Sequence, residues 1–268
     1  MPDWREHILR PGLRHPRLRA RLRDGERLIG TFVKSGDPAV AEALAIAGYD
    51  FIVADMEHSS LSVAAAEGIV RACDCYDVPV IARIPATGLG LCGQLLDAGM
   101  TGIQVSDVIS AADAKAAQAA VHYPPLGRRS LSLATRAARF GAVPAATHIA
   151  ASLAQTVLVG QIESAEGVSA LAEIIASGVF DALFFGPADM SVSLRRPGEA
   201  DHPDVLAALD AATDIITGSG MRLGIFCANA EQALRWADRG LTLLGVGTDM
   251  SMLGAAARST LGQLRTRS

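Results

Sequence analysis

The sequence is poor in several features that mark particular classes of protein. Aromatic residues make up only 4% of its 268 residues while 50% are hydrophobic, so we expect a core of alanine, valine, leucine and isoleucine. The formal net charge of −4 gives no sign of the basic surface that nucleic-acid binding usually needs. No apolar run approaches the roughly 18 residues that span a bilayer, and the arginine-rich residues 1–30 lack the continuous apolar core of a secretory signal. We therefore expect a soluble, cytoplasmic protein that binds neither membranes nor nucleic acid.

Two common site motifs are also missing. The cysteines at positions 73, 75, 92 and 227 do not have the C-x-x-C spacing of zinc or redox sites, so we expect them to be small buried hydrophobes. No G-x-G-x-x-G turn follows the first or second predicted strand. An open, doubly wound sheet that binds a dinucleotide is therefore disfavoured.

What the sequence does contain is a regular alternation of strand and helix patterns. The predicted strands are 28–33, 51–55, 79–83, 101–105, 157–163, 182–186, 222–227 and 243–247. The predicted helices are 38–48, 63–75, 89–98, 111–121, 167–177, 205–218, 231–240 and 253–264. Eight such units without a linker predict a single-domain (β/α)8 TIM barrel over residues 25–268, and the chain length suits that fold. Residues 1–24 form an arginine-rich lead-in that we expect to be mostly solvated, although Leu9, Leu13 and Leu18 could dock a peripheral helix.

Two of the predicted strands end in carboxylates. Glu163 follows the run 157–162, and Asp189 follows the run 182–186 after a short turn. The carboxyl ends of barrel strands meet at one mouth, where converging carboxylate oxygens bind hard divalent cations. An acid after a strand is also a common N-cap of the next helix, an alternative that applies to Asp189 in particular. Because both acids occur on neighbouring strands, we predict a metal site.

Other polar residues follow the strands that would surround this mouth. Asp55-Met56-Glu57-His58 ends the second strand, Arg83 the third, and Gln161 lies in the fifth. A histidine beside acids can act as an acid or base, although a lone loop histidine is more often a hydrogen-bonded surface residue. An arginine that ends a core strand needs an anion, such as a carboxylate or enolate. No predicted strand ends in lysine, which disfavours Schiff-base chemistry.

The turn Gly186-Pro187-Ala188-Asp189 predicts a further binding element. Glycine permits close approach of a ligand to the backbone, and Pro187 is suited to the first position of a helix. The free N–H groups at such a helix start form an anion site, where a substrate carboxylate could lie.

Together these residues resemble a known family, the HpcH/HpaI class II, metal-dependent pyruvate aldolases. The resemblance runs from about residue 30 to 253, in the order and spacing of the family. It is carried by Asp55-Met56-Glu57-His58, Arg83, Tyr123-Pro124-Pro125-x-Gly127-x-Arg129, Gln161-Ile162-Glu163 and Gly186-Pro187-Ala188-Asp189. It implies a barrel that reversibly cleaves 4-hydroxy-2-oxo acids into pyruvate, or a related 2-oxo acid, and an aldehyde.

The resemblance also implies roles for particular residues. Glu163 and Asp189 would hold Mg²⁺, Mn²⁺ or Co²⁺, and Arg83 would bind the 2-oxo oxygen and stabilise the enolate. His58 would transfer protons, paired with Asp97. The remaining implied contacts to the bound 2-oxo acid come from Gln161 and from the backbone at Gly186, Ala188 and Asp189. Such enzymes commonly form hexamers, built from dimers that exchange their last helix.

The sequence departs from the family pattern in two places. Gln104-Val105-Ser106-Asp107 replaces the usual Val-Pro after the fourth strand, and residues 126–139 are rich in arginine. We expect these arginines near the aldehyde entrance, where they would bind an anionic aldehyde or form subunit contacts. Two rival functions remain: a C–C lyase of the citrate-lyase-β or malyl-CoA type, and a catalytically silent barrel that serves as a binding module.

Overall fold

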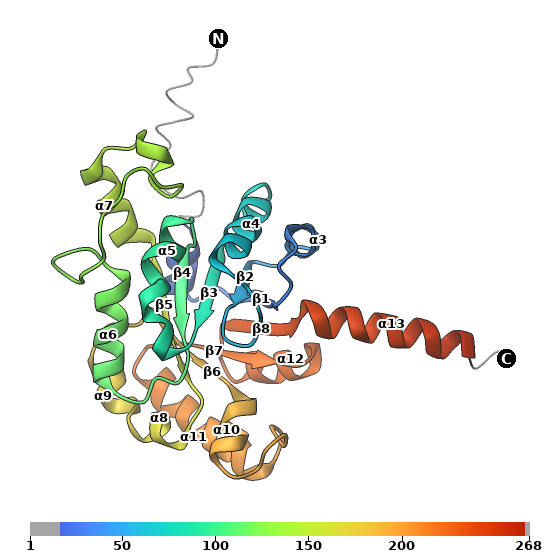
Figure 1. The fold of residues 1–268 in the computed structure, drawn as a ribbon. Helices are drawn as coiled ribbons and strands as arrows, with labels where there is room; N and C mark the ends of the chain where they lie inside the picture. The colour runs from blue at the N-terminus through green and yellow to red at the C-terminus, as the bar shows by residue number, and fades with distance from the viewer. Residues whose placement is uncertain (1–16, 266–268) are drawn as a thin grey trace.

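The eight predicted strands close into a parallel barrel. The computed structural model describes residues 17–265, and in it the strands pair in sequence order, with the last strand beside the first (Figure 1). The strands are β1 (Leu28–Val33), β2 (Phe51–Asp55), β3 (Val80–Ile84), β4 (Gly102–Val105), β5 (Val157–Ile162), β6 (Ala182–Phe185), β7 (Arg222–Cys227) and β8 (Leu243–Thr248). Each agrees with its predicted range to within one residue at either end. The predicted (β/α)8 barrel is therefore confirmed.

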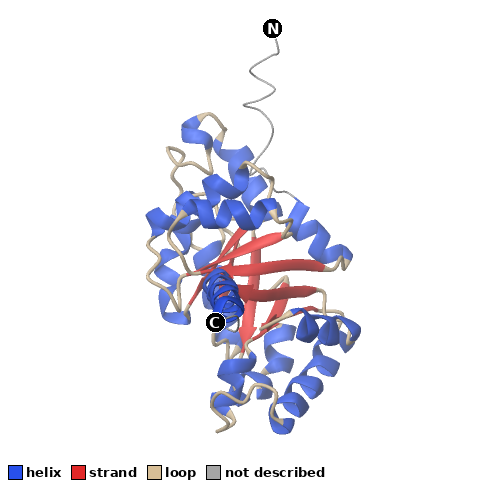
Figure 2. Cartoon of the chain, turned by 90° about the vertical axis from the view of Figure 1, so that its right-hand side faces the viewer, coloured by secondary structure: helices blue, strands red, loops and turns tan. Residues whose placement is uncertain are grey.

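The helices form a layer around the strands (Figure 2). The helices are α2 (Arg17–Asp24), α3 (Pro38–Ile46), α4 (Val63–Asp74), η1 (Ala86–Leu91), α5 (Cys92–Asp97), α6 (Ala111–Val121), η2 (Arg139–Gly141), α7 (Ala145–Gln155), α8 (Ala165–Ser169), α9 (Leu171–Ala176), α10 (Pro187–Ser193), α11 (Pro203–Gly218), α12 (Ala230–Asp238) and α13 (Asp249–Arg265). Sequence patterns did not predict α7, whereas the helix start expected at Pro187 is the first residue of the short α10. None of the described helices is long and apolar enough to cross a membrane.

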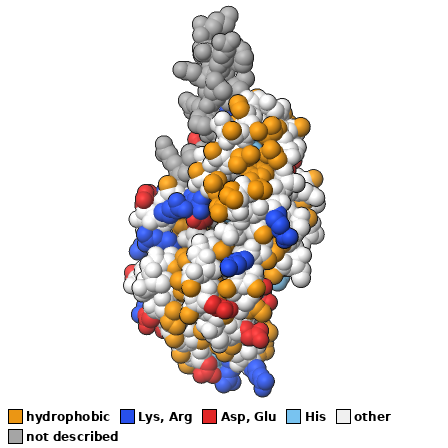
Figure 3. Space-filling model, turned by 90° about the vertical axis from the view of Figure 1, so that its left-hand side faces the viewer, with side chains coloured by type: hydrophobic (Ala, Val, Ile, Leu, Met, Phe, Trp, Pro, Cys, Tyr) orange, Lys and Arg blue, Asp and Glu red, His pale blue; other side chains and the backbone are white. Residues whose placement is uncertain are grey.

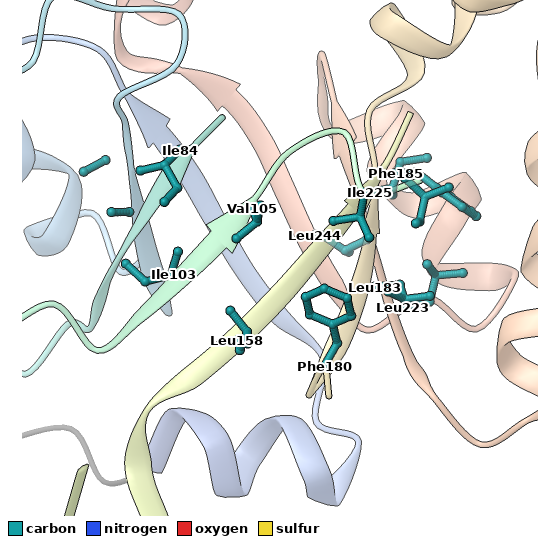
Figure 4. Close-up of a cluster of buried hydrophobic side chains, with 14 of the residues drawn as sticks. Ile84, Ile103, Val105, Leu158, Phe180, Leu183, Phe185, Leu223, Ile225 and Leu244 are labelled. Atoms are coloured by element: carbon teal, nitrogen blue, oxygen red, sulfur yellow. The ribbon is translucent and has the colours of Figure 1, made fainter. Parts of the chain in front are cut away.

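Alternate residues of each strand face two separate apolar clusters. In β2, Phe51 and Val53 belong to the cluster inside the barrel, whereas Ile52 and Ala54 belong to the outer cluster between strands and helices. Figure 4 shows part of the outer cluster, with aliphatic side chains from neighbouring strands.

Phenylalanine contributes more to the barrel interior than we expected from the composition, which predicted a core of aliphatic residues. Phe32, Phe51 and Phe184 are among the largest fully buried side chains. Glycine makes room for them, because a Cβ added to Gly245 would lie 2.8 Å from the Phe32 ring and 3.1 Å from that of Phe184. Phenylalanine rings therefore fill part of the barrel interior.

The end of the lead-in closes the amino-terminal end of the barrel. Leu18 and Leu22 on α2 are 3% and 1% exposed and belong to the inner cluster. Arg19 Nε donates a 2.7 Å hydrogen bond to Asp181, just before β6. The alternative that Leu18 docks a peripheral helix is therefore confirmed, and the prediction of a mostly solvated lead-in was wrong for Leu18 and Leu22. Leu9 and Leu13 lie outside the described residues.

The last helix, α13, extends away from the barrel (Figure 1). Only Asp249, at its start, is buried, whereas Leu253, Leu261 and Leu264 are exposed. A helix that leaves such residues uncovered has little contact with its own barrel.

Replacing Leu22 by alanine tests the docking of α2. Because the side chain is 1% exposed, the substitution should lower the free energy of unfolding by about 2–4 kcal/mol. Urea denaturation measures this value, and Leu234→Ala on α12, where the side chain is 60% exposed, serves as the control with an effect below about 0.5 kcal/mol. Equal effects would show that α2 does not close the barrel.

Candidate active site

Polar side chains line the barrel interior at the carboxyl ends of the strands. The register places Asp55 on β2 beside Arg83 on β3, and Arg83 beside Gln104 on β4. Asp55 and Arg83 continue the inward-facing rows of β2 and β3, which contribute Phe51, Val53 and Ile81 to the inner cluster. The barrel interior therefore changes from apolar to charged between one layer of inward-facing side chains and the next.

Arg83 and Asp55 form a two-point ion pair. Arg83 Nε and Nη2 donate to Asp55 Oδ1 and Oδ2 at 3.0 and 2.6 Å, and the guanidinium lies over the Phe32 ring, 4.9 Å from its centroid. Burial raises the pKa of the fully buried Asp55 carboxyl, but the hydrogen bonds and charge of Arg83 outweigh it, so that the pKa lies below its ordinary value. The anion that Arg83 requires is thus partly provided by the chain itself. Its Nη1 forms no hydrogen bond with any described residue and remains available to a ligand.

Asp55 also shapes the loop that carries His58. Its Oδ1 accepts hydrogen bonds from the backbone N–H groups of Glu57, at 3.2 Å, and His58, at 3.1 Å. The His58 side chain is 51% exposed, and its Nε2 lies 4.0 Å from Glu57 Oε2. Glu57 Oε2 in turn lies 3.6 Å from Arg83 Nε, while its Oε1 accepts a hydrogen bond from Ser106. His58, Glu57 and Arg83 are therefore neighbours at the mouth.

A chain of amides supports Glu163. Gln104 Nε2 donates to Gln161 Oε1 at 2.5 Å, and Gln161 Nε2 donates to Glu163 Oε2. The other carboxylate oxygen of Glu163 accepts the Asp107 backbone N–H at 2.9 Å. These donors hold a carboxylate that is only 7% exposed in one orientation.

The positions of Glu163 and Gln161 leave no room for a side chain at position 186, which is occupied by glycine. A Cβ at this position would lie 2.5 Å from Glu163 Oε2 and 3.0 Å from Gln161 Nε2. The chain then enters α10, whose first backbone hydrogen bond runs from Met190 N–H to Gly186 O at 2.9 Å. The N–H groups of Ala188 and Asp189 precede that bond and are free of helical partners.

The charges of Glu163 and Asp189 are not neutralised by the chain. Burial raises the pKa of Glu163 to about 7; the Gln161 hydrogen bond opposes the rise, and the negative charges of Asp189 and Glu57 add to it. Within residues 17–265, neither Glu163 nor Asp189 forms an ion pair with a basic side chain. No group of three or more His, Cys, Asp or Glu side chains within that range could hold a metal ion. Two acidic oxygen donors without a cationic partner fit a hard divalent cation whose other positions are filled by water or substrate.

Asp97 does not lie beside His58 in this chain. It ends α5, which leads into the start of β4, whereas His58 follows the carboxyl end of β2. The two residues are therefore at opposite ends of the barrel. Asp97 Oδ1 instead accepts a 2.6 Å hydrogen bond from Arg129 Nη2.

The arginine-rich segment contributes to the same remote region. Arg136 forms an ion pair with Asp74 at the end of α4, and the Arg129 guanidinium lies over the Tyr123 ring. Arg129 and Arg136 both bind carboxylates at the amino-terminal end of their own barrel, so they do not line the aldehyde entrance of the same chain.

Sequence reasoning missed Lys34. No described strand ends in lysine, but Lys34 directly follows β1, and its Nζ lies 3.4 Å from Asp55 Oδ2. Its place immediately after Val33 was the signal that could have identified it. Asp249, in contrast, does not provide a free carboxylate, because its two oxygens accept the backbone N–H groups of Lys34 and Ser35 at 3.0 and 2.8 Å.

Comparison with known proteins places the chain in a family. Residues 28–256 match the model of the HpcH/HpaI aldolase/citrate lyase family. A hydroxypyruvate/pyruvate aldolase from Delftia acidovorans is 36% identical over 92% of this chain and 91% of its own length. A 2-dehydro-3,6-dideoxy-6-sulfogluconate aldolase from Pseudomonas putida is 34% identical over 89% of this chain and 93% of its own length.

A solved structure of a family protein from Burkholderia cenocepacia superposes with a TM-score of 0.87 at 33% identity, covering 92% of this chain and 98% of that protein. Family model, relatives and fold agree over nearly the whole barrel. The chain is therefore a member of the HpcH/HpaI aldolase/citrate lyase family.

Proposed function

We propose that this protein is a carbon–carbon lyase, a class II aldolase that reversibly cleaves a 4-hydroxy-2-oxo acid into pyruvate, or a related 2-oxo acid, and an aldehyde. The observation that carries the proposal is the pair Glu163 and Asp189, two neighbouring carboxylates without a basic partner, in a mouth that also presents Arg83. Relatives named as a hydroxypyruvate/pyruvate aldolase and a sulfogluconate aldolase support the reaction class.

Glu163 and Asp189 would hold the divalent cation, with Mg²⁺, Mn²⁺ and Co²⁺ as the candidates. When bound, such a cation draws electron density from the 2-oxo acid and acidifies the hydrogens next to its carbonyl group. Gln161 and the Asp107 N–H orient Glu163 for this role by their hydrogen bonds.

The start of α10 would bind the substrate carboxylate. The N–H groups of Ala188 and Asp189 are available, and Gly186 leaves the space beside Glu163 free of a side chain. Gln161 lies against the same space and would support the bound 2-oxo acid. These contacts orient the donor before any proton moves.

Arg83 would stabilise the negative charge of the enolate, and His58 would transfer the proton. Arg83 Nη1, which has no hydrogen-bond partner in the described part of the chain, would donate to the 2-oxo oxygen and stabilise the negative charge that forms there, while Asp55 fixes the guanidinium from behind. In the cleavage direction His58 would accept the proton of the 4-hydroxyl group, and in the addition direction it would return that proton.

Asp97 can act with His58 only if it comes from a second copy of the chain. The exposed hydrophobic side chains support an oligomer in which such copies meet. Figure 3 shows hydrophobic side chains gathered on the face that carries α6 and α7, and the exposed residues of that region are Leu126, Leu131, Phe140 and Leu153. The exposed leucines of α13 would be covered if dimers exchange this helix, and a hexamer of such dimers is the assembly we propose.

Two rival functions are separated by one assay. A malyl-CoA-type lyase would require a CoA ester, and a silent barrel would turn over no substrate. The aldolase should combine pyruvate with an aldehyde without CoA and should stop when EDTA removes the metal ion. Turnover that persists in EDTA would contradict the proposal.

Replacing Glu163 by glutamine tests the metal ligands. The substitution removes one of two anionic donors, so Mn²⁺ binding measured by electron paramagnetic resonance and metal-dependent aldol turnover should both be lost. Glu166→Gln, three residues away and exposed on α8, is the matched control and should leave both unchanged. Normal turnover of Glu163→Gln with added Mg²⁺ would refute the assignment.

Arg83 is tested best by lysine. Lysine keeps the positive charge but loses the planar fork, so turnover should fall by about 10²–10³-fold. Arg83→Ala should in addition lower the free energy of unfolding by about 3 kcal/mol, because it removes both hydrogen bonds that Arg83 makes to the buried Asp55. Steady-state kinetics and urea denaturation measure the two effects. Unchanged turnover in Arg83→Lys would exclude the proposed role.

The pairing of His58 with Asp97 across subunits is tested by complementation. His58→Ala and Asp97→Asn should each be poorly active alone, whereas co-expressed mixtures should regain activity, because some sites then combine an intact His58 with an intact Asp97 from another copy. Separately purified oligomers mixed under conditions that prevent subunit exchange are the control. Mixed oligomers no more active than the single variants would rule out this arrangement.

A further inference from the structure

Lysine is rare in this chain, and one of its two lysines lies in the mouth. The sequence contains lysine only at positions 34 and 115 and otherwise uses arginine as its basic residue. Lys115 lies on the exposed surface of α6. Lys34 follows β1 on the inward-facing row that contains Phe32, and its side chain is 30% exposed.

The backbone at Lys34 is held in place. Its N–H and that of Ser35 both donate to Asp249 at the start of α13, at 3.0 and 2.8 Å. This clamp directs the Lys34 side chain across the mouth to Asp55 Oδ2, 3.4 Å from its Nζ. No hydrogen bond from Nζ to any described residue accompanies this contact, so the ammonium interacts with Asp55 through charge.

The single negative charge of Asp55 therefore interacts with two cations. Arg83 binds both of its oxygens, and Lys34 lies against the one that Arg83 Nη2 also contacts. Glu57 adds a second carboxylate, 3.6 Å from Arg83 Nε. Without Lys34, Arg83 would be the sole cation beside two carboxylates, and an incoming anion would meet a group with a net negative charge.

We propose that Lys34 is a positioning residue of the enolate-forming step, which shares Asp55 with Arg83 and so leaves more of the guanidinium's positive charge for the 2-oxo oxygen. The proposal rests on the aldolase function proposed above. The charge of Lys34 offsets that of Asp55, so the net charge of Arg83, Lys34, Asp55 and Glu57 is zero, and an anion that approaches the free Nη1 edge of Arg83 no longer meets a net negative charge. The effect is strongest in the transition state, because the negative charge on the 2-oxo oxygen is larger there than in the ground state.

Two other roles for Lys34 make different predictions. A Schiff base requires a free amine, whereas the ammonium that pairs with Asp55 has no lone pair with which to attack a carbonyl group. Recognition of an anionic aldehyde would use the same ammonium for the second substrate and would not affect chemistry at the first. A measurement confined to the 2-oxo acid therefore distinguishes the three roles.

The test follows exchange of the pyruvate methyl protons for deuterium, with Mg²⁺ present and no aldehyde. In this half-reaction a C–H bond breaks, its electron pair enters the enolate, and a deuteron from the solvent replaces the lost proton. Proton NMR gives kcat and KM for wild type, Lys34→Met, Lys34→Arg and the control Lys115→Met. The kcat of Lys34→Met should fall by about tenfold, because one compensating charge near the enolate is lost. Lys34→Arg should restore most of the rate, and Lys115→Met should equal wild type.

Several results would overturn the inference. The inference is wrong if Lys34→Met exchanges the methyl protons at the wild-type rate. If the exchange rate is unchanged and only the turnover of anionic aldehydes falls, Lys34 binds the aldehyde substrate instead. A loss that Lys34→Arg does not restore, with a lower melting temperature in both variants, would assign it to folding. Borohydride trapping of pyruvate on Lys34, detected by mass spectrometry, would assign it to covalent catalysis. If the metal-loaded wild type exchanges no protons at all, the aldolase function itself fails.

Discussion

Two like charges are held close together at the mouth of this barrel, and no cationic side chain among residues 17–265 pairs with them. Glu163 is buried and fixed by Gln161 and the Asp107 N–H, and Asp189 lies near enough to raise its pKa. Burying acidic groups together is unfavourable unless something positive is bound between them. The rest of the mouth is consistent with this requirement, because its basic side chains, Arg83 and Lys34, are directed to Asp55 and not to this pair.

The barrel makes this separation of charges possible. Strands in parallel register place the acidic pair on β5 and the start of α10, and the Asp55–Arg83 pair on β2 and β3, across the mouth. An anionic 2-oxo acid between them would meet the cation on one side and the guanidinium on the other. The phenyl rings beneath provide a dry floor in which these electrostatic interactions are strong. In the proposed reaction the fold would thereby supply preorganised charge on both sides of the reacting carbonyl group.

Strand periodicity was sufficient to predict the barrel and the residues at the strand ends. Short apolar runs of regular spacing have few alternatives, which explains why each predicted strand lies within one residue of the observed one. Contacts between side chains were harder to predict. Arg83 was expected to need an anion, but the sequence does not show that Asp55 provides one. Lys34 was overlooked because it stands one position beyond its strand.

The sequence also could not predict which residues far apart in the chain come into contact. Nothing in the local pattern of Leu18 and Leu22 shows that α2 closes the barrel floor, because that depends on the open end of eight distant strands. Asp97 matches the family's acid in sequence, yet it lies at the end of the barrel opposite His58 and binds Arg129. The local sequence pattern therefore predicts which residues lie at each end of the barrel. Which of these residues contact one another, across the barrel or between copies of the chain, depends on the folded structure.

The most direct measurement is a crystal structure with Mn²⁺ and pyruvate, with anomalous scattering used to locate the metal ion. We predict an anomalous peak between the carboxylates of Glu163 and Asp189, with the 2-oxo oxygen of pyruvate directed to Arg83. A map with no peak there, or with either carboxylate paired to a basic side chain, would contradict the proposed metal site and the reaction that depends on it.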